Sequence, residues 1–249
     1  MPKRVVLLGH PVSQSLSGAL QQTAFEALGI DAVYEPQDTP TIDLAAAIEA
    51  LRGDDYLGAN ISYPHKERVV PMVDRLTDEA QHTGAVDTIT KDGGQLVGHN
   101  TDVLGFRPAL EALVGNQRMP RSAVVLGAGG GARAVVYSLI TASFQNIVVF
   151  NRHLHRAERL VKHFGRSAAH MELRAKPWHE SVIEAELART EILINASSVG
   201  RDPEETPIPS ELLRPEILVM DLLYAPAETR LLREAAAAGA TATEATTEE

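Results

Sequence analysis

The sequence predicts an α/β protein with two halves, an N-terminal α/β domain and a Rossmann-like domain built on a doubly wound parallel sheet. Three observations support this fold class. Short apolar runs alternate with helical patterns, the alternation becomes regular after residue 106, and a glycine-rich segment follows one of the runs. Continuous apolar strands that alternate with helices indicate a parallel sheet covered on both faces. The 249 residues suffice for two moderate domains.

The first half begins with an expected strand at 4–8, followed by a serine-rich loop and a helix. Apolar residues recur every four positions from Leu16 to Leu28, and Gly29 is a typical C-terminal stop for that helix. The other elements expected here are strands at 32–35 and 56–61, a helix from Leu44 that ends at Gly53, and a hairpin with its turn at 92–94.

Four β-branched apolar runs are expected to form the strands of the second half, with helices in most of the gaps. They are SAVVLG (122–127), NIVVFN (146–151), EILINA (191–196) and EILVMDLLY (216–224). The final stretch, AAAAGATATEATTEE, has low complexity and is expected to fray.

Composition narrows the classes of function. A net charge of −10 argues against a general nucleic-acid surface, which needs concentrated Lys and Arg. No apolar run approaches the ~20 residues of a membrane span, and the first residues resemble a strand rather than a secretory signal. The absence of cysteine excludes disulfides, thiolate catalysis and Cys-based zinc sites. We expect a cytoplasmic protein with a small-molecule ligand, no metal and no nucleic-acid or membrane partner.

The segment VVLGAGGGARAVV is the most informative local pattern. Gly127, Gly129 and Ala132 fit G-x-G-x-x-G/A directly after a predicted strand and at the start of a predicted helix. The first glycine allows a tight turn, the second lets a pyrophosphate approach the backbone, and the third small residue lets the helix pack closely. The segment therefore indicates dinucleotide binding, with a tight turn that binds no ligand as the alternative.

Residues after the next strand indicate which dinucleotide is bound. An NAD site usually has an acid ~20 residues after the glycines, to bind the ribose 2′-hydroxyl. This chain has Asn151-Arg152-His153 there, with His155 and Arg156 nearby. A guanidinium suits a 2′-phosphate, so the prediction is NADP; solvated cations at a helix start are the alternative.

Polar residues that could carry chemistry lie in loops of the first half. Taken singly, Ser15 and Ser17 could cap the following helix, and Asn100 and Asp102 could cap the next one. A Lys and an Asp at the ends of neighbouring strands could instead form a proton-transfer couple. In the segment GANISYPHKERVV, Pro64 is expected to turn the chain so that Lys66 begins a helix, whose dipole disfavours the charged amine.

Eight motifs, in order along nearly the whole chain, resemble those of the shikimate dehydrogenase family. The segment GHPVSQSLS is similar to Gly-x-Pro-x-x-x-Ser-x-Ser, GANISYPHK to Asn-Val-Thr-x-Pro-x-Lys, and GAVDT to Gly-Ala-Val-Asn-Thr. The segment GHNTDVLGF matches Asn-Thr-Asp-x-x-Gly. The remaining motifs are GAGGGARA, NR, INASSVG and DLLYAPAETRLL.

The resemblance implies NADP-dependent, reversible reduction of 3-dehydroshikimate to shikimate in the biosynthesis of chorismate and the aromatic amino acids. It implies that Lys66 and Asp102 are the catalytic pair at the reacting oxygen. The substrate-binding residues that it implies are Ser15, Ser17, Asn60, Ser62, Asp87, Asn100 and Tyr224. The cofactor-binding residues that it implies are Gly127, Ala128, Gly129, Gly130, Gly131, Ala132, Asn151, Arg152, His153, Arg156, Asn195, Ala196, Ser197 and Ser198.

The resemblance also implies a division into a substrate-binding domain over 1–105, joined by 230–249, and an NADP-binding domain over 106–229. A monomer or a homodimer is expected. The chain departs from the family pattern at Gln14, Gly18, Ser62 and Asp87. It also ends before the family's last helix, so weaker substrate binding is expected.

Asp87 is the departure with the clearest chemical consequence. The family has Asn there, which both donates and accepts hydrogen bonds, whereas a carboxylate only accepts and adds charge near an anionic substrate. Asp87 is therefore expected to weaken shikimate binding or to favour a related ligand. Two alternatives stay open: a quinate/shikimate dehydrogenase with relaxed specificity, and a non-catalytic NADP-binding relic.

Overall fold

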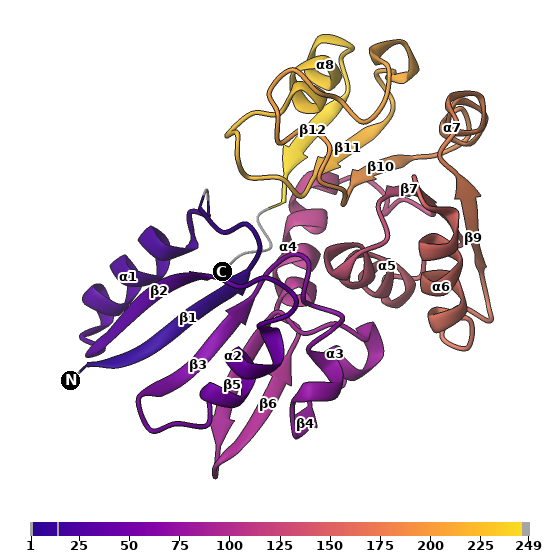
Figure 1. Cartoon of the computed structure of the whole chain (residues 1–249). Coiled ribbons are helices and arrows are strands. Elements are labelled where there is room, and N and C mark those ends of the chain that lie inside the picture. The colour runs from indigo at the N-terminus through magenta and orange to yellow at the C-terminus, as the bar shows by residue number, and fades with distance from the viewer. Residues whose placement is uncertain (1, 14, 246–249) are drawn as a thin grey trace. The chain divides into compact units, whose positions relative to one another are not determined.

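The computed structural model describes residues 2–13 and 15–245 and contains two compact units (Figure 1). The boundary lies between Thr101 and Asp102, close to the predicted one at residue 105. Each unit is built on a sheet of six described strands, which confirms the α/β fold class and its division into two halves. No helix within the described ranges is long and apolar enough to cross a membrane.

The sheet of the first unit is mixed. Its described strands are β1 (Lys3–Gly9), β2 (Ala32–Asp38), β3 (Tyr56–Ile61), β4 (Arg75–Leu76), β5 (Thr88–Asp92) and β6 (Gln95–His99). They lie in the order β2-β1-β3-β5-β6-β4, with β1 parallel to both neighbours and β5 antiparallel to both of its own. Gly93 and Gly94 have positive φ between β5 and β6, so the predicted hairpin is confirmed.

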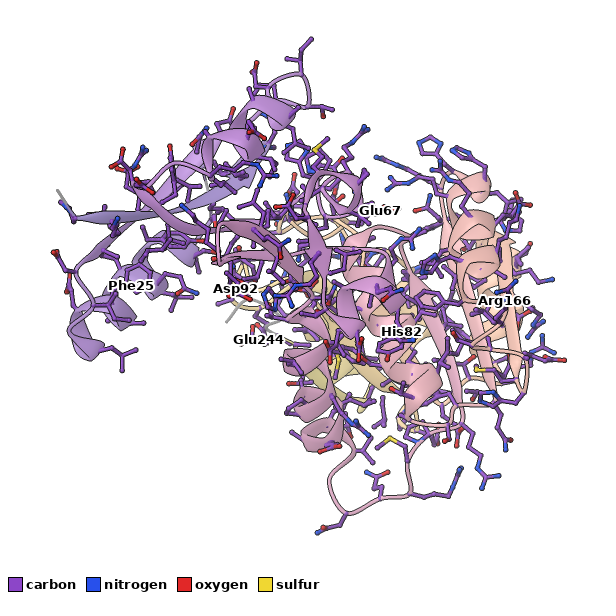
Figure 2. The ribbon with its side chains drawn as sticks, turned by 90° about the horizontal axis from the view of Figure 1, so that it is seen from below. Phe25, Glu67, His82, Asp92, Arg166 and Glu244 are labelled. Atoms are coloured by element: carbon purple, nitrogen blue, oxygen red, sulfur yellow. The ribbon has the colours of Figure 1, made fainter. Side chains whose placement is uncertain are left out.

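Three α-helices and one 3₁₀ helix accompany this sheet in the described residues. They are α1 (Ser17–Leu28), α2 (Leu44–Ala50), η1 (Val70–Met72) and α3 (Asp78–Thr83). The predicted stop of α1 at Gly29 is confirmed, with φ of 67°. Its apolar stripe does not face the core, however: Leu20 is 58% and Leu28 74% exposed. The aromatic residue of α1, Phe25 (Figure 2), instead packs edge-on against Tyr34 of β2.

The second unit has a fully parallel sheet. Its described strands are β7 (Ser122–Leu126), β8 (Asn146–Asn151), β9 (Glu172–Pro177), β10 (Ile192–Asn195), β11 (Leu218–Asp221) and β12 (Thr241–Glu244). The order β12-β11-β10-β7-β8-β9 corresponds to the strand order of a Rossmann fold. From β7 the sheet extends to one side through β8 and β9, and to the other side through β10, β11 and β12. The strand order therefore reverses between the adjacent strands β7 and β10.

Helices cover both faces of this sheet. They are α4 (Asp102–Val114), α5 (Gly130–Thr141), α6 (Leu154–Phe164), α7 (Glu180–Leu187), α8 (Arg230–Ala237) and the 3₁₀ helix η2 (Ser210–Leu212). Along β7, Ala123 and Val125 join one buried cluster with α4, α5 and α6, whereas Val124 and Leu126 join a second with α7 and α8. This burial on both faces explains the uninterrupted apolar runs of the sequence.

The C-terminal part of the chain differs from the prediction. The described residues of the 230–249 segment lie in the second unit, where α8 packs on the sheet and β12 pairs in parallel with β11. Assigning this segment to the first domain was therefore wrong for those residues. The expected fraying was wrong for residues 241–244, which form β12, while residues 246–249 lie outside the described residues.

Candidate functional site

The glycine-rich turn joins β7 to α5. Gly127 has φ of 111°, and a Cβ atom built on it would lie 2.4 Å from the carbonyl oxygen of Ala196. Gly129 is the N-cap residue of α5, and a Cβ there would meet nothing closer than 3.9 Å. Ala132, in the first turn of the helix, is fully buried. The three positions thus provide the tight turn, the open approach and the close helix packing that a dinucleotide requires.

The surroundings of this turn also suit a phosphate. Ala128 is buried, and Gly130 and Gly131 begin α5, where main-chain amides lack partners within the helix and the dipole favours negative charge. The turn follows β7, and residues 196–199 follow the adjacent β10. It therefore lies at the switch point of the sheet, where doubly wound proteins bind ligands.

A cluster of cationic and imidazole side chains follows β8. The guanidinium of Arg156 lies 3.9 Å from a Cβ built on Gly129, so this residue lies beside the glycine-rich turn. The carbonyl of His153 accepts hydrogen bonds from the Asn151 amide at 3.0 Å and from the Arg156 main-chain N–H at 2.9 Å. Arg152 and His153 are exposed. These residues can provide a 2′-phosphate with a cationic environment.

The loop after β10 is held by Asn195, which is completely buried. Its Oδ1 accepts hydrogen bonds from the N–H and hydroxyl of Ser197 at 3.1 and 2.7 Å, and its Nδ2 donates to the Val199 carbonyl at 3.0 Å. Ala196 donates its N–H to the Leu126 carbonyl at 2.8 Å. Asn195 thus orders this loop from within the protein, whereas Ser198 is exposed.

Asp221 is a buried acid that the sequence interpretation passed over. It ends β11 beside Asn195, whose Nδ2 donates to its Oδ1 at 2.9 Å. The Thr229 hydroxyl donates to its Oδ2 at 2.8 Å, and burial raises its pKa to about 6. The sequence signal that could have indicated a buried acid was the position of Asp221 at the end of an apolar strand, because a buried charge needs hydrogen-bonding partners. Tyr224 lies three residues later, in the loop between β11 and α8, and is half-buried.

In the first unit, Asn60 and Asp87 are connected through residues that lacked a local sequence signal. The Tyr34 hydroxyl donates to Asn60 Oδ1 at 2.9 Å, and Asn60 Nδ2 donates to the Thr88 hydroxyl at 3.1 Å. Asp87 Oδ1 accepts from the Thr88 hydroxyl at 2.9 Å and from the N–H and hydroxyl of Thr101 at 2.9 and 2.8 Å. Strand pairing brings these residues together, because Asn60 of β3 is opposite Thr88 of β5.

The serine motif lies at the start of α1. The Ser15 hydroxyl donates to the Ser17 hydroxyl at 3.0 Å and accepts from the Ser17 N–H at 3.2 Å. Leu16 is the N-cap residue and makes no side-chain cap, whereas the N–H that Ser15 accepts is that of the first residue of the helix. The neighbouring departure Gln14 lies outside the described residues.

Lys66 lies in a series of turns, so the predicted helix start at this residue was wrong, and the helix-dipole argument for its amine does not apply. Its carbonyl accepts from the Val86 N–H at 2.8 Å, which ties the turn to the segment that carries Asp87. The neighbouring His65 is completely buried and its Nε2 lies 2.7 Å from the Thr39 carbonyl. Ser62 donates its N–H to the Leu8 carbonyl at 2.9 Å, at the end of β1.

Asn100 and Asp102 are both buried. Asn100 Nδ2 donates to the Ala85 carbonyl at 3.0 Å, which fixes the turn before β5. Asp102 is the first residue of α4 and of the second unit, one residue after the Thr101 that binds Asp87. Among the described residues, no three His, Asp or Glu side chains are grouped so that they could hold a metal ion.

Comparison with known proteins places these motifs in a family. Residues 7–89 match the shikimate dehydrogenase substrate binding domain, and residues 112–203 match the shikimate / quinate 5-dehydrogenase domain. The NADP(+) shikimate dehydrogenase of Salinibacter ruber is 40% identical over 242 residues, which are 95% of this chain and 84% of the relative.

Solved structures agree with this relationship. The shikimate 5-dehydrogenase of Thermus thermophilus, in complex with NADP(H) and shikimate, has a TM-score of 0.83 and 38% identity over 99% of this chain and 88% of its own. The quinate dehydrogenase of Corynebacterium glutamicum, in complex with NAD, has a TM-score of 0.85 and 29% identity, over 99% of this chain and 89% of its own. With its two matched domains, its Rossmann strand order and its glycine-rich turn, the chain belongs to the shikimate dehydrogenase family.

Proposed function

We propose that this protein is an NADP-dependent shikimate dehydrogenase, which reversibly reduces 3-dehydroshikimate to shikimate. The observation that carries the proposal is the glycine-rich turn at the switch point of the second sheet, with Arg156 beside Gly129. When NADPH is bound, it supplies the hydride, and the protein supplies orientation and proton transfer. Family membership is the reason to choose shikimate as the substrate.

In this proposal the cofactor residues are those of the second unit. The amides of the glycine-rich turn bind the pyrophosphate, and Arg152 and Arg156 bind the 2′-phosphate with Asn151 and His153 near them. The loop that Asn195 orders, residues 196–198, supports the nicotinamide end.

In the same proposal most of the substrate-binding residues belong to the first unit. Ser15 and Ser17 bind the carboxylate, and the ring substituents are bound by Asn60, Ser62, Asp87 and Asn100. Tyr224, a residue of the second unit, also binds the ring substituents. Lys66 donates a proton to the carbonyl oxygen during reduction, and Asp102 binds a neighbouring hydroxyl. General acid catalysis of this kind typically contributes ~10²–10⁴ in rate.

One assay tests the proposed activity. The purified chain is mixed with NADP or NAD and with shikimate or quinate, and the reduced nicotinamide is followed by its absorbance. Turnover with shikimate and NADP supports the proposal. Turnover only with quinate or NAD supports the related paralogue, for which the Asp87 carboxylate is the specific argument, and cofactor binding without any turnover supports a non-catalytic protein.

Replacing Arg156 with alanine is expected to raise KM for NADP by about 10–100-fold, the value of a charge-assisted hydrogen bond worth ~1.5–3 kcal/mol. KM for NAD should change by less than about threefold, because NAD lacks the phosphate. Arg159→Ala is the matched control, since Arg159 is an exposed arginine of the same helix. Equal losses for NADP and NAD would contradict the assignment.

Replacing Asp87 with asparagine is expected to lower KM for shikimate about threefold to tenfold. The change removes a negative charge from the region proposed to bind an anionic substrate, and the amide oxygen can still accept from Thr101. Steady-state kinetics with shikimate and quinate measure the effect. A rise of KM for both substrates would mean that the carboxylate itself is a favourable contact.

A further inference from the structure

The two loops that leave the ends of β10 and β11 in the second unit share one buried acid. Residues 196–199 follow β10, and residues 222–229, which include Tyr224, follow β11. Asn195 and Asp221 are the last residues of these strands and lie side by side in the parallel register. Both side chains are completely buried.

Asp221 is hydrogen-bonded directly to the loop after β11, and to the loop after β10 through Asn195. Its Oδ1 accepts from Asn195 Nδ2 at 2.9 Å and from the Leu223 N–H at 3.1 Å, and its Oδ2 accepts from the Thr229 hydroxyl at 2.8 Å. Asn195 continues the network through its bonds to Ser197 and to the Val199 carbonyl. The same carboxylate thus holds both loops in position, one of them through Asn195.

The loops also pack against each other and against the glycine-rich turn. A Cβ built on Gly200, at the end of the first loop, would lie 3.3 Å from Leu223 and 4.0 Å from Thr229 in the second. On the other side, Ala196 is so close to Gly127 that no side chain fits between them. A displacement at Asp221 would therefore reach the turn that is proposed to bind the pyrophosphate.

We propose that Asp221 is a positioning residue, whose carboxylate holds residues 196–199 and 222–229 in the arrangement that binds NADP. The proposal rests on the proposed cofactor site but not on the identity of the substrate. Asp221 touches neither ligand in this proposal and acts through Asn195, Leu223 and Thr229.

The charge state of Asp221 makes the proposal testable. Burial raises its pKa to about 6, against the effect of the bonds from Thr229, Leu223 and Asn195, which lower it. The ionised form accepts three hydrogen bonds, whereas a protonated form must give up one acceptor position to its own O–H. NADP affinity should therefore fall as the pH drops through about 6.

Other charged groups lie on the elements that neighbour β11, and the comparison with Asp221→Asn separates their effect on NADP affinity from that of Asp221. On β12, Glu244 is opposite Asp221 in register and is exposed. On α8, Arg230 binds Glu234 and the Glu204 carbonyl, and Arg233 binds the carbonyls of Glu228 and Pro203.

Folding stability should respond to pH in the opposite sense. The pKa of Asp221 is raised from 3.8 in the unfolded chain to about 6 in the folded state. The folded state is therefore favoured most by this acid below pH 3.8, and that stabilisation is lost as the pH rises through about 6. Asp221→Asn, which is neutral and of the same shape, should therefore melt at a higher temperature than the wild type at pH 7.5. If Asp221 positions the loops, the same variant should bind NADP more weakly.

The experiment is direct titration of the full chain with NADP between pH 5 and pH 8, without substrate, together with melting curves. For Asp221→Asn we expect an affinity about threefold to tenfold lower at pH 7.5 and a smaller change of affinity around pH 6. For Asp221→Ala, which removes the acceptor of three hydrogen bonds, we expect a loss of at least about tenfold. Glu244→Gln is the control acid-to-amide change and should match the wild type.

An Asp221→Asn variant with the wild-type affinity and pH profile would overturn the proposal, even if its melting temperature changed. Because the readout is NADP binding, a chain that binds NADP but does not oxidise shikimate would contradict the proposed function and leave this inference intact. A wild-type chain that does not bind NADP would overturn both.

Discussion

Replacing Lys66 with alanine should lower kcat for shikimate oxidation by about 10²–10⁴-fold, the typical contribution of a general acid or base, and should leave NADP affinity unchanged. The main chain of Lys66 is fixed by its bond to Val86, and the adjacent His65 is buried against Thr39. The turn should therefore survive truncation of the side chain. A loss of rate would then reflect the missing amine and not a displaced loop.

Steady-state kinetics and a separate NADP titration measure the two quantities. Lys91→Ala is a suitable control, since it removes another lysine of the first unit, one that has no role in the proposed reaction. If the Lys66→Ala enzyme kept a near-normal kcat, Lys66 would have no part in proton transfer. If it lost NADP binding as well, the change would have disturbed more than the proposed acid.

Alanine at Gly127 should destabilise the protein by about 2–6 kcal/mol and abolish NADP binding. A non-glycine residue held at a positive φ of this size costs about 1–3 kcal/mol, and forcing a Cβ into a filled space costs about 1–3 kcal/mol more. The Cβ would lie 2.4 Å from the Ala196 oxygen, which is main chain and cannot rotate away. Urea unfolding measures the change in stability.

Two other glycines of the same turn separate stability from binding. Gly129→Ala should leave stability nearly unchanged, because its Cβ has room, but should lower NADP affinity by crowding the pyrophosphate. Gly131→Ala is the matched control for stability, since its Cβ would meet Leu222 at an ordinary 3.6 Å. Similar unfolding midpoints for Gly127→Ala and Gly131→Ala would contradict the steric explanation.

The parts of the fold that follow local rules were predictable from the sequence. Strands β7, β8, β10 and β11 of the second sheet are apolar and buried, and Gly29, Gly93 and Gly127 have the left-handed conformations that their contexts suggested. Their positions needed no knowledge of distant contacts. The glycine-rich turn in particular is defined by a strand, a turn and a helix that are consecutive in the chain.

The errors have tertiary causes. The segment TATE has no distinctive pattern, and it forms β12 only because β11 offers a parallel edge, an example of pairing that overrides propensity. The turn at Lys66 is held by Val86, twenty residues later in the chain, which no local pattern could indicate. Tyr34 and Thr88 likewise reach Asn60, and Thr101 reaches Asp87, through the folding of the sheet rather than through sequence spacing.

The hydrogen bonds that run from Tyr34 to Asp87 have a single polarity. A carboxylate can only accept hydrogen bonds, so the Thr88 hydroxyl donates its single hydrogen to Asp87. The same hydroxyl oxygen must therefore accept from the Asn60 amide group. Asn60 is thereby turned with its carbonyl oxygen toward Tyr34. An asparagine at position 87 could either donate to the Thr88 hydroxyl or accept from it. The hydrogen bonds of this series could then run in either direction. The face that Asn60 offers to a ligand is thus decided by Asp87, to which Asn60 is joined through Thr88.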